Sequence, residues 1–149
     1  MNRDDEIDRV LSYRTWAVVG CSPDPRRDSH EVAAKLRQWG YDVIPVNPAV
    51  DEVLGERCYA SVHDIPDDVR VDVVDVFRRA DRAGAHVDEA IAIGARAVWL
   101  QLGVVDHDAA GRAEAAGLTV VMDRCPAIEY PRRSVSLAPS PRGSGRHPA

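Results

Sequence analysis

The sequence has no excess of positive charge and no long apolar run. Its 149 residues include 19 Lys and Arg against 24 Asp and Glu, which gives a formal net charge of −5. A surface that holds nucleic-acid phosphates needs a positive excess, so no nucleic acid is expected as a partner. Because no stretch approaches the roughly 18 apolar residues of a membrane helix, we also expect no membrane association.

Cysteine is scarce as well. Cys21, Cys58 and Cys125 are odd in number and widely spaced, which excludes a disulfide framework and the paired spacing of a metal site. The first residues are polar and acidic, without the apolar segment of a secretory signal. We therefore expect a cytoplasmic protein with reduced thiols and no bound metal.

Short β-branched runs alternate with alanine-rich stretches of helical period. The runs are typical of strands covered on both faces, because they are apolar nearly throughout; they are 16–20, 42–46, 71–77, 97–102 and 118–122. Helices are expected over 4–13, 29–39, 87–93 and 108–116, with an irregular crossover over 51–70 that has room for one helical turn.

This alternation predicts one α/β domain over residues 1–131. We expect a doubly wound, Rossmann-like parallel sheet of five strands in the order 3-2-1-4-5. From residue 132 to residue 149, Pro, Ser, Gly and Arg dominate, and too little apolar area remains to offset the entropy of ordering. A disordered tail is predicted there.

Doubly wound sheets bind ligands at the carboxyl ends of their strands, where the strand order reverses. The loop after the first strand combines a glycine, hydroxyls, basic residues and a helix N-terminus, which favours a phosphate. Its candidates are Gly20, Cys21, Ser22, Arg26, Arg27 and Ser29. The G-x-G-x-x-G pattern of NAD binding is absent, since Ser22 stands at the second glycine position. An ordinary strand–helix turn with Ser29 as its cap is the alternative.

Three further loops at the same edge carry candidates. The loop after the second strand has an amide and a proline where NAD enzymes place an acid. The loop after the third strand has an aromatic residue followed by arginine. The loop after the fourth strand has a buried amide, which needs a hydrogen-bond partner. The residues are Val46, Asn47, Pro48, Phe77, Arg78, Leu100, Gln101 and Leu102. The structural alternatives are that the prolines only stiffen their loop, that Phe77 packs in the core beside surface arginines, and that Gln101 bonds to a backbone carbonyl.

Two thiols also belong to this edge of the predicted sheet. Cys125 follows the last strand beside Arg124, and Cys21 follows the first strand. An activated thiol there would make the protein a thiol-dependent enzyme or a redox sensor. Most free cysteines are simply small buried hydrophobes, which is the alternative.

Six motifs occur in a fixed order along the chain. They are Val-Val-Gly-Cys-Ser-Pro over 18–23, Val-Asn-Pro over 46–48, Val-Leu-Gly-Glu over 53–56, Asp-Val-Phe-Arg-Arg over 75–79, Val-Trp-Leu-Gln-Leu-Gly over 98–103 and Met-Asp-Arg-Cys-Pro over 122–126. Together they closely resemble the small stand-alone CoA-binding proteins. These are similar to the CoA-binding domain of the succinyl-CoA synthetase alpha subunit and, more distantly, to the nucleotide-binding domain of redox-sensing repressors. The resemblance covers about residues 14–131.

The resemblance implies a domain that holds coenzyme A, or an acyl-CoA, through its ADP portion. It assigns residues 20–22 to the diphosphate turn, Arg26, Arg27 and Ser29 to phosphate contact, residues 46–48 with Phe77 and Arg78 to the nucleotide, and residues 100–102 to the pantetheine path. The synthetase catalyses through a phosphohistidine and a further domain, and neither has a counterpart here. Binding without ligase activity is therefore expected. An NAD(H)-binding regulatory subunit, an oligomer and a protein partner remain open.

Overall fold

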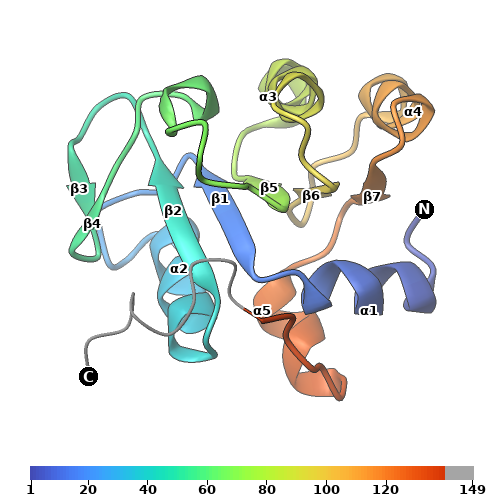
Figure 1. Cartoon of the computed structure of the whole chain (residues 1–149), viewed down its shortest axis with the longest axis horizontal. Helices are drawn as coiled ribbons and strands as arrows, with labels where there is room; N and C mark the ends of the chain where they lie inside the picture. Colours follow the sequence, from blue (N-terminus) through green and yellow to red (C-terminus); the bar gives the residue numbers. More distant parts are fainter. Residues whose placement is uncertain (140–149) are drawn as a thin grey trace.

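The computed structural model describes residues 1–139 of the chain. Its centre is a parallel sheet with the strand order β2, β1, β5, β6, β7 (Figure 1). The strands are β1 (Thr15–Val19), β2 (Asp42–Val46), β5 (Val73–Val76), β6 (Ala97–Leu100) and β7 (Thr119–Val121). The predicted α/β fold with five parallel strands is confirmed, and every strand falls within a predicted run or begins one residue before it.

The predicted strand order 3-2-1-4-5 is wrong. Counted along the chain, the five strands lie in the order 2-1-3-4-5, because β5 pairs with β1 and not with the outer edge of β2. Pro45 of β2 explains the difference, since a proline has no N–H with which to extend a ladder along that edge. The edge holds only one bridge, in which Tyr59 N donates to Pro45 O (3.1 Å) and Asn47 N donates to Tyr59 O (2.9 Å).

The crossover between β2 and β5 contains more structure than the sequence predicts. A small antiparallel hairpin joins β3 (Glu52–Val53) to β4 (Glu56–Arg57), and one 3-10 turn, η1, spans Val62–Asp64. The hairpin turn needs positive φ at its two central positions, and Leu54 and Gly55 adopt φ of 55° and 73°.

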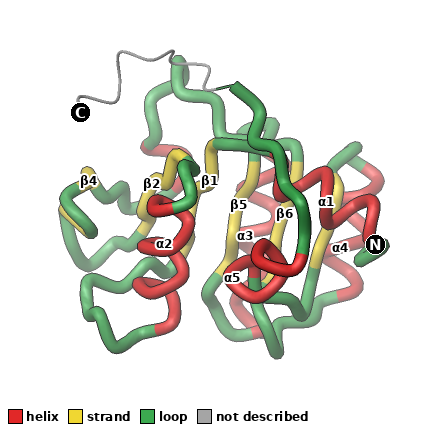
Figure 2. The backbone as a smooth tube through the Cα atoms, turned by 90° about the horizontal axis from the view of Figure 1, so that it is seen from below, coloured by secondary structure: helices red, strands yellow, loops and turns green. Residues whose placement is uncertain are grey.

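Helices cover both faces of the sheet. α3 (Ala80–Ala92) and α4 (His107–Ala115) lie on one face, and α1 (Asp4–Ser12), α2 (Asp28–Gln38) and α5 (Pro126–Glu129) lie on the other (Figures 1 and 2). α3 begins at Ala80 rather than at residue 87, and α5 was not predicted at all. No helix within residues 1–139 is long and apolar enough to span a bilayer.

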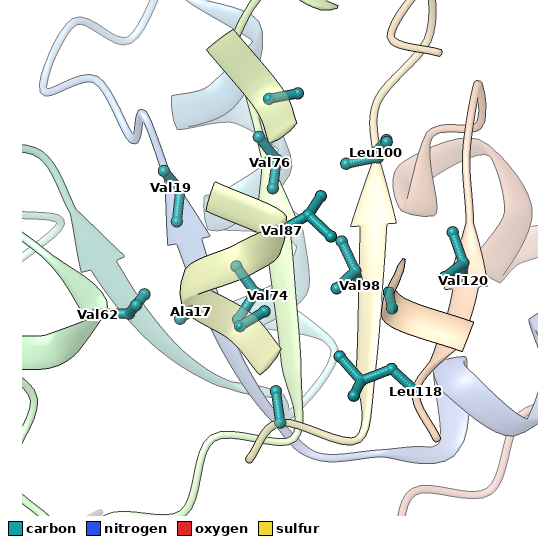
Figure 3. Close-up of a cluster of buried hydrophobic side chains, with 14 of the residues drawn as sticks. Ala17, Val19, Val62, Val74, Val76, Val87, Val98, Leu100, Leu118 and Val120 are labelled. Carbon is teal, nitrogen blue, oxygen red and sulfur yellow. The ribbon is translucent and has the colours of Figure 1, made fainter. Parts of the chain in front are cut away.

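An aliphatic core fills the space between the sheet and α3 (Figure 3). Val74, Val76 and Val98 are fully buried, and they belong to the same cluster as Val87 of α3. Apart from Leu100 of β6, the strand residues in this cluster are small or β-branched, which gives a flat surface that a helix can cover closely.

The opposite face of the sheet is built around two tryptophans. Trp16 of β1 and Trp99 of β6 are fully buried, and their ring centroids lie 5.6 Å apart. Trp16 Nε1 donates to Tyr13 O, and Trp99 Nε1 donates to Arg124 O, both at 2.8 Å. The second bond fixes the loop after β7, directly before Cys125.

Both ends of the described chain are tied to the domain. The Asn2 side chain donates to Met122 O (2.7 Å) and accepts from Met122 N (2.8 Å) beside β7. Ala138 N donates to Ser12 O (2.9 Å). Residues 132–139, which the sequence assigns to a disordered tail, therefore pack on the domain, and the remainder of that predicted tail (140–149) lies outside the described residues.

Arg133 is the main anchor of this C-terminal segment. Its guanidinium pairs with Asp8 (2.8 Å), Asp4 (3.1 Å) and Glu129 (3.1 Å). Glu129 is only 7% exposed, so its charge depends on this partner. The ion pairs of Arg133 thus join α1, α5 and the C-terminal segment.

Replacing Arg133 with Ala should lower the free energy of unfolding by roughly 2–4 kcal/mol, because Glu129 is left buried without its close partner. Arg132→Ala is the matched control: Arg132 is 70% exposed and lies 3.8 Å from the same carboxylate, so its loss should cost about 0.5 kcal/mol or less. Denaturant unfolding measures both, and equal losses would contradict the prediction.

Candidate ligand-binding site

The carboxyl edge of the sheet encloses two adjoining hollows. The strand order reverses there between β1 and β5, not between the first and fourth strands as the predicted order implied. The loops after these strands lead to helices on opposite faces, which is where doubly wound sheets bind ligands. The two hollows therefore lie at the edge where the sequence predicts a site, but between different neighbouring strands.

We call the two cavities the β1–β2 hollow and the β5–β6 hollow, with volumes of about 510 Å³ and about 640 Å³. The first is lined by Gly20, Ser22, Arg27, Asp28, Ser29, Asn47, Pro48, Phe77 and Arg78. The second is lined by Asp28, Glu31, Val32, Lys35, Phe77, Arg78, Arg79, Ala80, Gln101, Leu102, Gly103, Val104, Cys125, Ala127 and Ile128. Three residues line both hollows, so the two adjoin.

Gly20 allows the loops after β1 and β5 to touch. It has a φ of +83°, and a Cβ at this position would lie 2.6 Å from Phe77 O. Gly20 N and Cys21 N both donate to Val46 O, at 2.9 and 3.2 Å. The loop after β1 is thus fixed against both neighbouring strands, and no other residue fits at its first position.

Three polar side chains that the sequence offered to a ligand instead build this loop. Ser29 Oγ accepts from Ser22 N (3.0 Å), and Ser22 Oγ accepts from Asp24 N (3.0 Å). Asn47 donates to Cys21 O (3.0 Å) and accepts from Ala49 N (2.9 Å). The arrangement is preorganised, and the donors it leaves for an anion are the O–H groups of Ser22 and Ser29, the first N–H groups of α2 and guanidinium groups.

The N-terminus of α2 opens toward the β1–β2 hollow. The N-cap residue is Arg27, not Ser29 as the sequence suggested, and its side chain makes no capping bond. The first N–H groups of an uncapped helix lack partners within the helix and favour an anion. Arg27 and Arg78 line the hollow, and neither forms an ion pair within residues 1–139. The carboxylate of Asp28 is the one negative group on the same wall.

The β5–β6 hollow has a different character. Its walls combine aliphatic and charged side chains, and two of its large apolar side chains, Leu102 and Ile128, are exposed to solvent in the free protein. Lys35, Arg79 and Glu31 contribute charge to the lining. An apolar arm attached to an anionic head would match the pair of hollows.

Asp75 is a buried carboxyl behind this hollow. It is 0% exposed, on the sheet face that also carries Trp16 and Trp99. Its Oδ1 accepts from Gln101 Nε2 (2.9 Å), whereas its Oδ2 has no hydrogen-bond partner among the described residues. Burial raises the pKa of Asp75 to about 7, and the bond from Gln101 opposes the rise. Gln101 itself lines the hollow.

The three thiols lie in unequal surroundings. Cys21 and Cys58 are buried, and Cys125 is partly exposed and lines the β5–β6 hollow. Burial raises the pKa of the Cys21 thiol to about 12. Burial also raises the pKa of the Cys125 thiol, although the backbone N–H groups of Ala127 and Ile128 favour the thiolate. No cluster within residues 1–139 has the composition of a metal site.

The structure brings most of the predicted site residues together. Those that line a hollow are Gly20, Ser22, Arg27, Ser29, Asn47, Pro48, Phe77, Arg78, Gln101, Leu102 and Cys125. Cys21, Val46 and Leu100 are buried and line neither hollow. Arg26 also lines neither, because its guanidinium is 90% exposed and pairs with Asp24 (3.0 Å).

The sequence analysis missed the contribution of α2. Asp28, Glu31, Val32 and Lys35 line the β5–β6 hollow from one face of this helix. Their spacing of three and four residues was visible in the predicted helix and would have found them. Ala127 and Ile128 were missed because the short helix α5 has too weak a pattern.

The comparisons with known proteins agree with this geometry. A family model described as a CoA binding domain matches residues 14–131. The chain belongs to this family. The small CoA-binding proteins that its motifs resemble are thus shown to be its relatives.

Similar proteins include small relatives and parts of larger enzymes. The Bacillus subtilis protein YneT, described as uncharacterized, is 39% identical over 80% of this chain and 88% of its own length. A solved hypothetical protein from Pyrococcus horikoshii is 42% identical, with a TM-score of 0.82 over 87% of this chain and 91% of that one. The alpha subunit of acetate–CoA ligase (ADP-forming) II from Pyrococcus furiosus is 37% identical over 49% of this chain, which is 16% of that subunit.

Asp75→Asn should change how stability depends on pH. An unfolded Asp ionises near pH 4, whereas buried Asp75 ionises at about pH 7, so the folded wild type binds the extra proton between these values and loses stability as pH rises. The Asn variant keeps an acceptor for Gln101 and loses this titration. The free energy of unfolding of Asp75→Asn, measured relative to that of wild type, should therefore rise by about 4 kcal/mol between pH 4 and pH 8.

Denaturant unfolding at a series of pH values measures this difference. A flat difference for Asp75→Asn would show that Asp75 ionises normally in the folded protein.

Proposed function

We propose that the protein binds coenzyme A, or an acyl-CoA, at the carboxyl edge of its sheet. The observation that carries the proposal is the pair of adjoining hollows that share Asp28, Phe77 and Arg78. One hollow offers donors for an anion and the other offers apolar walls. Coenzyme A combines a nucleotide diphosphate with a long, weakly polar arm. The diphosphate would bind the donors of the first hollow, and the arm would pack against the apolar side chains of the second.

The β1–β2 hollow would hold the ADP portion. Backbone N–H groups at the start of α2 and the guanidinium groups of Arg27 and Arg78 would bind the phosphates through charge-assisted hydrogen bonds. Phe77 and Pro48 line the same hollow and would pack against the base. Arg26 is not part of this proposal, since it pairs with Asp24 outside the hollow.

The β5–β6 hollow would hold the pantetheine arm. Gln101 and Cys125 are uncharged polar groups in its lining, beside aliphatic side chains such as Val32 and Val104. The arm carries amide groups, which need hydrogen-bond partners when they leave water. Leu102 and Ile128 would be covered by the ligand, which accounts for two exposed apolar side chains on one rim.

Two features argue against NAD. Residues 47–48 follow β2 where NAD enzymes place an acid for the ribose hydroxyls, and the Asn47 amide is already bonded to Cys21 O and Ala49 N. The second glycine of the dinucleotide pattern is Ser22, which is part of the loop's own hydrogen bonding. The names of the ligase relatives, which include CoA, support the same choice.

Calorimetric titration tests the ligand. CoA should bind more tightly than NAD or NADP, and ADP should bind more weakly than CoA because it fills only the β1–β2 hollow. Binding of NAD more tightly than any CoA species would overturn the proposal.

Arg27→Ala should raise the Kd for CoA roughly tenfold or more, because one charge-assisted hydrogen bond contributes about 1.5–3 kcal/mol. Arg26→Ala is the matched control, since the neighbouring guanidinium lies outside the hollow and its removal should change the Kd less than about twofold. If both variants bind CoA like wild type, the phosphates lie elsewhere.

A further inference from the structure

We propose that Cys125 is a covalent attachment point for the thiol end of coenzyme A, with which it forms a mixed disulfide. The inference rests on the CoA binding proposed above and adds a chemical step at the β5–β6 hollow. It assigns this hollow a second ligand state, in which CoA is held by a bond as well as by contacts.

Position is the first argument. Cys125 is the one free thiol of the chain that is not buried, and it lines the β5–β6 hollow. Its backbone is held from two sides, because Trp99 Nε1 donates to Arg124 O (2.8 Å) and Cys125 O accepts from Ile128 N (3.0 Å). The thiol is therefore presented from a fixed loop.

Continuity of the two hollows is the second argument. A ligand anchored by its diphosphate in the β1–β2 hollow is directed past Phe77 and Arg78 into the hollow that contains Cys125. The far end of CoA is its thiol. Anchoring one end of a ligand raises the effective concentration of the other end at a nearby group, which favours exchange at this sulfur over exchange in solution.

A buried carboxyl that is linked to the hollow through Gln101 is the third argument, and it is independent of the cysteine. Asp75 is fully buried, and its Oδ2 has no hydrogen-bond partner among the described residues. Gln101, which donates to Oδ1, lines the hollow beside Cys125. An unsatisfied carboxyl oxygen is costly in a core that only has to pack, and such groups concentrate at functional sites.

The carboxyl also affects the thiol. Burial is the main reason for the raised pKa of Cys125, and the charges of Asp75 and Asp28 add to it. The thiol is thus mostly protonated at neutral pH and reacts slowly with small oxidants in solution. Reaction should require a disulfide that is held in place, and it should become faster as the pH rises.

The step needs one co-reactant, the symmetrical disulfide of CoA. The thiolate of Cys125 attacks one sulfur of the disulfide bound in the hollow, and the sulfur–sulfur bond of CoA disulfide breaks as the bond between Cys125 and CoA forms. The second CoA leaves as a thiolate and takes up the proton that Cys125 released. Cys125 and the retained CoA end as a disulfide, and the departing CoA ends as a thiol.

Intact-mass spectrometry with peptide mapping tests the inference on the full chain. Incubation with CoA disulfide should add one CoA to the peptide that contains Cys125. The reaction should run roughly tenfold or more faster than with glutathione disulfide, which lacks the ADP anchor, and ADP should slow it. Cys125→Ser should lose the adduct, and Cys58→Ser, whose sulfur is buried, should keep it.

The outcomes separate this inference from the proposed function. If wild type binds reduced CoA in calorimetry but forms no adduct with CoA disulfide, the inference fails and CoA binding stands. Equal rates with both disulfides would make Cys125 an ordinary exposed thiol and would also overturn the inference. If neither CoA binding nor an adduct is found, both proposals fail.

Asp75→Asn gives a further readout. Removal of the carboxylate charge should lower the pKa of Cys125 and speed adduct formation at neutral pH. The effect should fade at alkaline pH, where the wild-type thiol is itself ionised. An unchanged rate at every pH would remove Asp75 from the site.

Discussion

The contact between Gly20 and the carbonyl oxygen of Phe77 fixes the rest of the site. Only a residue without Cβ lets the loop after β1 approach the loop after β5 this closely. That approach brings Phe77 and Arg78 between the two hollows, so that both hollows can share them. A wider separation of the loops would divide one extended site into two unrelated ones.

Most of the architecture could be predicted because it depends on local pattern. The β-branched runs predict the five strands, and the Gly20 loop predicts an anion site at the start of a helix. Strand order depends on pairing between distant segments, which local pattern does not encode. The relevant local sign was Pro45, since a proline within a strand marks an edge.

The site was harder to predict where side chains serve the loop itself. Ser22, Ser29 and Asn47 are polar residues in a candidate site, yet their hydrogen bonds hold the loop. Asp75 was missed because an acidic residue inside an apolar strand gives no sign of where its oxygens point. The packing of residues 132–139 was missed because Arg133 pairs with two carboxylates far away in the sequence, those of Asp4 and Asp8, as well as with nearby Glu129.

Each outer edge of the sheet has one position that the chain itself occupies. On β2 the outer edge offers the Pro45 carbonyl, already bonded to Tyr59 N, and no N–H at that residue. On β7 the Asn2 side chain occupies both the N–H and the C=O of Met122, as a neighbouring strand would. Open edges invite aggregation through sheet extension. A strand from another molecule would therefore have to displace groups of this chain at either edge before the sheet could extend.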